Sequence, residues 1–169
     1  MKMQNEIQKI AKKLQLLPHP EGGFYRENYR CNLEIPQNIL GKEFSGSRNA
    51  STCIYFMLTS DSFSAFHRIK QDEIWHFYRG STLNLYLISQ DGELSIIKIG
   101  NDILNNETPQ YVVPAGYWFA AEVIEQNAYS LVGCTVAPGF DFADFELAEK
   151  EKLCDLFPKH KEVIYELCR

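Results

Sequence analysis

The chain has 169 residues, of which 45% are hydrophobic and 13% aromatic, and its formal net charge is -5. These values predict one packed domain over residues 1–169 and exclude an intrinsically disordered chain. The basic residues are scattered and the pI is near 5.4, and no apolar run approaches the roughly 20 residues of a membrane span, so we expect a cytoplasmic protein with neither a nucleic-acid nor a membrane partner.

The first helix is predicted over residues 3–16, because apolar residues recur there at helical spacing and Pro18 follows. The run EGGFYRENYR at 21–30 then begins with two turn-forming glycines and continues as a strand. Arg26 in this strand is a candidate clamp for a phosphate or carboxylate, with a surface ion pair as the alternative. The polar segment 36–48 is predicted to be a surface loop, or else a lid over a cavity.

A regular strand pattern begins at residue 50. The predicted strands cover residues 50–59, 63–70, 73–79, 82–89, 94–99, 110–114, 117–124 and 128–137. Many short strands at this spacing favour an antiparallel sandwich or barrel. After them, a helix is predicted over about residues 142–156 and a short one after Pro158. The predicted class is mainly β, with an N-terminal helix and C-terminal helices.

The stretch FHRIKQDEIWHFYRG at 66–80 holds the densest group of chemically active residues. Side chains alternate between the two faces of a strand, so His67 points inward from one predicted strand. On the next strand, Glu73, Trp75 and Phe77 share a face. An imidazole oriented by a carboxylate is a general base near neutral pH. The alternative is a structural barrel histidine with Glu73 as its partner.

These motifs resemble those of the cupin superfamily. Its first motif, His-x-His, three or four residues, Glu, six residues, Gly, is matched by His67, Ile69, Glu73 and Gly80, with Ile69 replacing the second histidine. Its second motif, Pro-x-Gly-x-x-His, is matched by PAGYWF at residues 114–119, with phenylalanine replacing the histidine. Together with GGFYRE and VGCTVAPGFDFADFELA, they make the chain similar to a cupin branch of unknown function.

The resemblance extends over about residues 14–157 and implies a double-stranded β-helix (jelly roll) and a homodimer. Metal-binding cupins use the motif histidines and glutamate, of which only His67 and Glu73 are present, so no metal cofactor is expected; a weakly bound divalent metal is the alternative. Jelly rolls similar to dTDP-4-dehydrorhamnose 3,5-epimerase lack a metal and pair a histidine base with a tyrosine acid. Tyr117, predicted on the strand face of Phe119, is the corresponding candidate acid.

The sequence therefore predicts a barrel that binds a small polar or carbohydrate-like molecule. As an enzyme it would be a metal-independent isomerase or epimerase, with His67 as base, Glu73 orienting it and Tyr117 as acid. The candidate ligand-binding residues are Arg26, Trp75, His76, Phe77 and Phe119.

Alternatives stay open for these assignments. The aromatic candidates also suit core or dimer packing. His76 needs a β-bulge to turn inward, because alternation places it on the outer face, where it suits a dimer interface. For the whole protein, the alternatives are a non-catalytic binding or sensor module and a metal-dependent cupin enzyme.

Overall fold

The strands predicted between residues 50 and 137 are all present in the computed structural model, which describes residues 2–169. They are β5 (Thr52–Thr59), β6 (Phe63–Arg68), β7 (Asp72–Gly80), β8 (Leu83–Ile88), β9 (Leu94–Ile99), β10 (Gln110–Val113), β11 (Trp118–Val123) and β12 (Tyr129–Ala137). The N-terminal segment forms α1 (Lys2–Leu14), β1 (Leu17–Pro18), β2 (Phe24–Arg30), β3 (Glu34–Ile35), α2 (Gln37–Leu40) and β4 (Arg48–Asn49). The C-terminal segment forms β13 (Glu146–Leu147), α3 (Lys150–Leu156) and α4 (Lys161–Leu167). Short 3-10 helices lie at Ile103–Asn105, Phe142–Asp144 and Pro158–His160.

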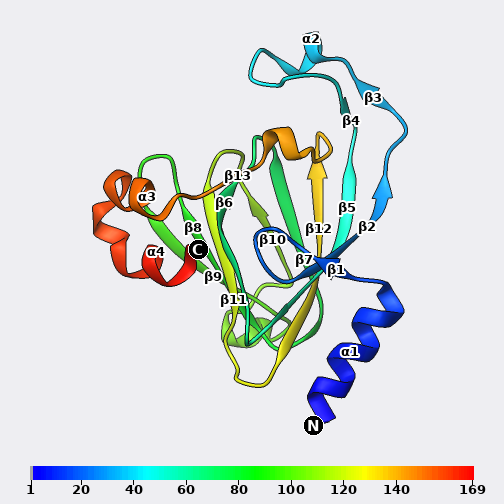
Figure 1. Ribbon diagram of the computed structural model, residues 1–169, viewed down its shortest axis with the longest axis vertical. Coiled ribbons are helices and arrows are strands. Elements are labelled where there is room, and N and C mark those ends of the chain that lie inside the picture. Colours follow the sequence, from blue (N-terminus) through cyan, green and yellow to red (C-terminus); the bar gives the residue numbers. More distant parts are fainter. Residues whose placement is uncertain (1) are drawn as a thin grey trace.

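Two antiparallel sheets face each other (Figure 1). One has the strand order β1-β2-β5-β12-β7-β10 and the other β13-β6-β11-β8-β9, while β3 and β4 pair separately. The predicted class, mainly β with an N-terminal helix and C-terminal helices, is confirmed. Within the described residues, no helix is long and apolar enough to cross a membrane.

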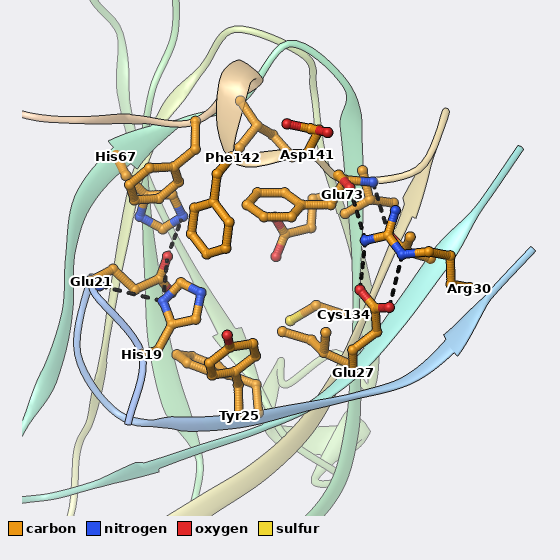
Figure 2. A pocket seen from close by; sticks show the side chains of 17 residues that line it. His19, Glu21, Tyr25, Glu27, Arg30, His67, Glu73, Cys134, Asp141 and Phe142 are labelled. Atoms are coloured by element: carbon orange, nitrogen blue, oxygen red, sulfur yellow. Dashed lines mark hydrogen bonds and ion pairs between the residues drawn. The ribbon is translucent and has the colours of Figure 1, made fainter. Parts of the chain in front are cut away.

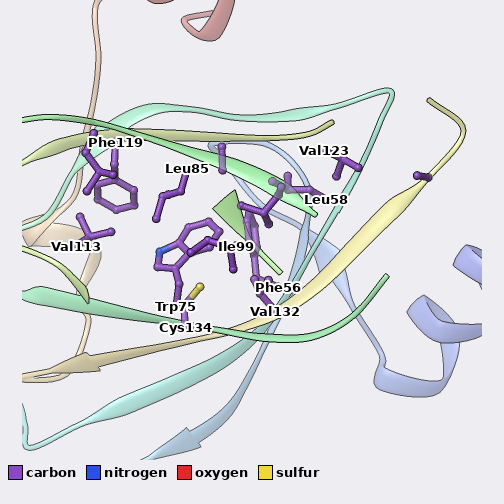
Figure 3. Close-up of a cluster of buried hydrophobic side chains, with 14 residues drawn as sticks. Phe56, Leu58, Trp75, Leu85, Ile99, Val113, Phe119, Val123, Val132 and Cys134 are labelled. Carbon is purple, nitrogen blue, oxygen red and sulfur yellow. The ribbon is translucent and has the colours of Figure 1, made fainter. Parts of the chain in front are cut away.

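The main core fills the space between the two sheets (Figure 3). Trp75 from β7 packs edge-on against Phe56 from β5 and Phe119 from β11, with ring centroids 5.8 and 6.5 Å apart. All three side chains are about 1% exposed. Large side chains therefore fill this part of the barrel interior.

Helices cover parts of the outer sheet faces. The predicted amphipathic α1 packs Ile7, Ile10 and Leu14 against a cluster that contains Met57 and Leu131. Helices α3 and α4 contribute to another cluster, which covers β6, β8 and β11.

The prediction of a continuous helix over residues 142–156 is wrong. Asp141 caps the start of this segment, since its side chain accepts a hydrogen bond from the N–H of Ala143, but only a 3-10 turn follows. The chain then extends and adds β13 to the edge of β6, and a helix begins only at Lys150. Pairing with an open strand edge thus replaced local helical hydrogen bonds.

Candidate functional site

A cavity of about 490 Å³ lies in the barrel (Figure 2). Strands β2, β5, β6, β7 and β12 form its walls, together with segments 19–21 and 140–145. The titratable residues that line it are His19, Glu21, Tyr25, Glu27, Arg30, His67, Glu73, Cys134 and Asp141. The structure therefore brings the predicted His67 and Glu73 into one cavity and adds acidic and basic groups that the sequence analysis did not select.

His67 is held at both ring nitrogens. Its Nδ1 lies 2.8 Å from the carbonyl oxygen of Ala65, and because a carbonyl only accepts, Nδ1 must carry a hydrogen. Its Nε2 lies 3.0 Å from Oε2 of Glu21, whose other oxygen accepts a hydrogen bond of 2.7 Å from Ser64. One proton must therefore lie between His67 Nε2 and Glu21 Oε2.

Burial decides how this proton is shared. His67 is 2% exposed and Glu21 is 6% exposed, so both charged forms lose their hydration. Desolvation lowers the pKa of His67, although the nearby Glu73 carboxylate opposes this shift. Desolvation also raises the pKa of Glu21. Both shifts favour a neutral imidazole that accepts a hydrogen bond from a protonated carboxyl group.

Glu21 reaches the cavity because two glycines follow it. Gly22 and Gly23 have φ angles of +117° and +73°, which L-residues with side chains rarely adopt. A side chain at Gly22 would also collide with the carbonyl oxygen of Phe63. The turn thus lies directly against β6, where the carbonyl of Glu21 accepts a hydrogen bond of 2.8 Å from Ala65. The glycine pair was the sequence signal for this close approach, but it did not reveal the partner strand.

His19 lies on the other side of Glu21 (Figure 2). Its Nδ1 accepts a hydrogen bond of 3.3 Å from the backbone N–H of Glu21 and lies 3.5 Å from Oε2. Its ring packs edge-on against Tyr25, with centroids 4.5 Å apart. Desolvation lowers the pKa of His19, which favours its neutral form. The site therefore contains a buried carboxyl group between two neutral histidines.

Glu73 points into the cavity from β7 and is 8% exposed. It forms no salt bridge with any residue of the described chain. Desolvation raises its pKa to about 7; the Glu21 carboxyl group acts in the same direction, while His67 opposes it. A carboxyl group that titrates near neutral pH is suited to both accepting and donating a proton.

The cationic residue in the cavity wall is Arg30, not the predicted Arg26. Arg26 is exposed and donates a hydrogen bond to the carbonyl of Leu14, outside the cavity. A register shift in the pairing of β2 with β5, between Glu27 and Tyr29, marks a β-bulge. The extra residue changes the face on which later side chains lie, so Arg30 joins Tyr25 and Glu27 at the cavity.

Arg30 is already occupied by protein acceptors. Its Nε and Nη2 donate to the two carboxylate oxygens of Glu27 at 2.8 and 2.7 Å. Its Nη1 donates to Asn49, and Nη2 also donates to the carbonyl of Phe140. A ligand anion would have to displace the Glu27 carboxylate to obtain a bidentate contact.

The other predicted site residues lie outside the cavity lining. Trp75 and Phe119 are buried in the core, and Phe77 and Tyr117 pack against it from partly buried positions. His76 lies on the outer face of β7, where its Nε2 is 3.1 Å from the hydroxyl of Thr135. The alternation of side chains correctly placed His76 and Glu73 on opposite faces of the strand. It did not show which inward residues would pack in the core and which would line the cavity.

A buried ion pair holds the part of the cavity wall that segment 140–145 forms. Arg48 forms two hydrogen bonds, of 2.6 and 2.7 Å, with the carboxylate of Asp144, which also accepts one from Gln71 at 2.7 Å. Burial opposes ionisation of Asp144, but these donors outweigh it and lower its pKa. Because Asp144 directly precedes the cavity-lining Phe145, this pair positions the wall. The predicted surface loop over residues 36–48 is thus anchored at its end by Arg48, with Phe44 buried within it.

The family described as Cupin superfamily (DUF985) matches residues 8–148 of this chain. The chain belongs to this cupin family. An uncharacterised protein of Saccharomyces cerevisiae, YML079W, is 32% identical over 156 residues, which cover 87% of this chain and 77% of the yeast protein.

Solved structures support the same assignment. Protein SO0799 from Shewanella oneidensis is 40% identical and has a TM-score of 0.85, with 96% of each chain covered. A hypothetical protein from Leishmania major is 35% identical, with a TM-score of 0.88 and coverage of 95% of this chain and 97% of that one. Oxalate decarboxylase from Bacillus subtilis, at 16% identity and a TM-score of 0.54, covers 89% of this chain and 36% of its own, and shows a shared fold alone. These likenesses confirm the predicted jelly roll.

The residues of this cupin do not fit a metal centre. Ile69 and Phe119 stand at two positions where metal-binding cupins have histidines, and the ring of Phe119 lies 4.0 Å from that of His67. The Nε2 atom of His67 faces Glu21. Among residues 2–169, no group of three or more His, Cys, Asp or Glu side chains is arranged to hold a metal ion.

Proposed function

We propose that this cupin is a metal-independent isomerase or epimerase of a small hydroxyl-rich carbonyl compound, such as an aldose or ketose. One observation carries the proposal: a histidine–carboxyl pair that shares one proton lines the same cavity as a carboxyl group with a pKa of about 7. Two proton-transfer groups near one bound carbon atom are what such a reaction requires.

The cavity suits a monosaccharide in size and surface. Its volume of about 490 Å³ is typical of small-molecule sites. Tyr25, Phe142 and Phe145 supply flat apolar surfaces for the carbon skeleton of a sugar, and the carboxyl groups supply acceptors for its hydroxyls.

The proposed reaction conserves charge within the cavity. The Glu73 carboxylate removes a proton from the carbon next to the carbonyl group, while the Glu21–His67 pair gives its shared proton to the carbonyl oxygen, producing an enediol. The pair then takes the proton of the neighbouring hydroxyl, and Glu73 returns its proton to the other carbon atom. Relative to the sequence-based roles, Glu73 becomes the base, because His67 is engaged at both nitrogens.

An epimerase needs a proton donor on the opposite face of the bound substrate. The hydroxyl of Tyr25 points into the cavity from β2 (Figure 2). We propose that Tyr25 takes the role that the sequence analysis gave to Tyr117, which lies outside the cavity lining.

A binding module without chemistry is the second candidate. The observation in its favour is that both nitrogens of His67 have protein partners, as expected for a purely structural histidine. In that case the aromatic walls would determine affinity, and His67 would only hold the turn that contains Glu21.

Deuterium incorporation separates the two candidates. We expect the wild-type protein in D₂O to exchange the carbon-bound hydrogen next to the carbonyl group in at least one member of a panel of neutral aldoses and ketoses, measured by NMR. His67→Gln should lower the exchange rate by about 10²–10⁴-fold, the usual contribution of general acid–base catalysis. A sugar that binds but acquires no deuterium would favour the binding module.

The matched control for this experiment is His76→Gln. His76 is also a histidine on a strand, but it is only partly buried and lies on the outer sheet face. We expect exchange by this variant to stay near the wild-type rate. An equal loss in both variants would mean that folding, and not proton transfer, explains the effect.

A further inference from the structure

The cavity wall carries more acidic than free basic groups. Arg30 and Glu27 neutralise each other through their bidentate contact. The Glu21–His67 pair is also neutral as a unit, because it shares one proton. Of the remaining carboxyl groups, Glu73 is buried, whereas Asp141 is exposed and lies near Arg30.

The polar neighbours of Glu73 include the uncharged side chains of Cys134 and Trp75, neither of which supplies a positive charge. Asp141 uses Oδ1 to cap the 3-10 turn by accepting from Ala143 at 2.8 Å. Glu73 is 8% exposed and has no salt-bridge partner in the chain from residue 2 to 169. A buried carboxylate without a cation is unfavourable, and a cationic ligand would remove that penalty.

Aromatic rings surround the same space. Phe142 lies 5.0 Å from Phe140 and 6.0 Å from Phe145, measured between ring centroids, and both contacts are edge-to-face. All three rings line the cavity, as does Tyr25 across from them (Figure 2). Aromatic faces attract cations through their quadrupoles, and aromatic walls combined with carboxylates are suited to ammonium groups.

We infer that the cavity selects an amine-bearing sugar, a small organic cation with hydroxyl groups, and excludes phosphorylated or carboxylated sugars. The inference that the ligand is a sugar rests on the proposed function, whereas the inferred preference for a positive charge rests on the residues of the cavity wall. An ammonium group would lie between the Glu73 carboxylate and the aromatic rings. A phosphate in the same place would face Glu73 and Asp141, and its nearest strong donor, Arg30, is bound to Glu27.

Calorimetric titration with three matched probes tests this inference: glucosamine, glucose and glucose 6-phosphate. Glucosamine should bind at least about tenfold more tightly than glucose at neutral pH, because a charge-assisted hydrogen bond contributes more than a neutral one. Glucose 6-phosphate should bind more weakly than glucose.

Variants locate the source of the preference. Glu73→Gln keeps the shape of the side chain and should reduce the ratio of glucosamine to glucose affinity to near one. Asp141→Asn, which keeps a capping oxygen, should reduce it partly. Glu162→Gln, a surface change on α4 outside the cavity lining, should leave the ratio unchanged.

Several results would overturn the inference. Glucose could bind as tightly as glucosamine or more tightly, or glucose 6-phosphate could bind more tightly than glucose. Glucosamine could also fail to bind at millimolar concentration, or the ratio of glucosamine to glucose affinity could stay unchanged in Glu73→Gln. The proposed reaction fails separately: a glucosamine preference without deuterium exchange would remove the isomerase but keep the charge selection. Deuterium exchange in neutral sugars without a preference for glucosamine would keep the isomerase but remove the charge selection.

Discussion

Asp144→Ala is expected to reduce the free energy of unfolding by about 3–5 kcal/mol, because it leaves the guanidinium of Arg48 buried without its partner. The Arg48 and Asp144 side chains are only 5% and 0% exposed, and two hydrogen bonds join them. Gln71 would lose an acceptor as well. Urea denaturation followed by circular dichroism measures this loss.

A surface ion pair on the same wall provides the control. Arg68 and Glu146 lie 2.7 Å apart, but their side chains are 42% and 54% exposed. Glu146→Ala should therefore cost less than about 1 kcal/mol. A similar loss in both variants would contradict the role of the Arg48–Asp144 pair as the anchor of the cavity wall.

Glu73→Gln is expected to stabilise the protein at pH 8 while it abolishes turnover. In the native protein the pKa of Glu73 is raised from 4.5 to about 7, mainly by burial. The stabilising contribution of the protonated form is present below about pH 4.5 and is lost as the pH rises through about 7. The shift corresponds to about 3 kcal/mol of stability that the wild-type protein loses when Glu73 ionises. The glutamine variant does not lose it, because glutamine stays neutral.

The measurement is a comparison of unfolding free energies at about pH 5 and about pH 8. The difference between Glu73→Gln and wild type should be largest at about pH 8 and small at about pH 5, where Glu73 is protonated. A glutamine variant whose relative stability does not change with pH would show that Glu73 is ionised in the native cavity throughout. The gain in stability with loss of turnover is expected where a site keeps an unfavourable buried acid for its chemistry.

The sequence was sufficient for the strands and for most of the architecture. Alternating patterns between residues 50 and 137 predicted every strand there, because each has one face against a core. The segment after residue 141 was mispredicted as a helix, since its short extended part depends on the distant edge of β6. Local sequence does not contain that pairing.

The candidate site was only partly predictable. Alternation placed His67 and Glu73 inward, as the cavity lining shows. It missed Glu21, whose position depends on a glycine turn docking against β6. It also could not show that Arg30 reaches the cavity, because the bulge after Glu27 moves the later residues of β2 to the other face. Contacts across long sequence separations and single-residue register shifts leave no periodic signal.

The protonation state of His67 is tested most directly by nitrogen-15 NMR of histidine-labelled protein, with His67→Gln used to assign the signals. Near pH 7 and above, we expect His67 to be neutral, because burial lowers its pKa, with Nδ1 protonated and Nε2 accepting a hydrogen bond. This is the state in which Glu21 holds the proton that the proposed reaction uses. A His67 ring that is doubly protonated near pH 7, or that carries its single proton on Nε2, would contradict it.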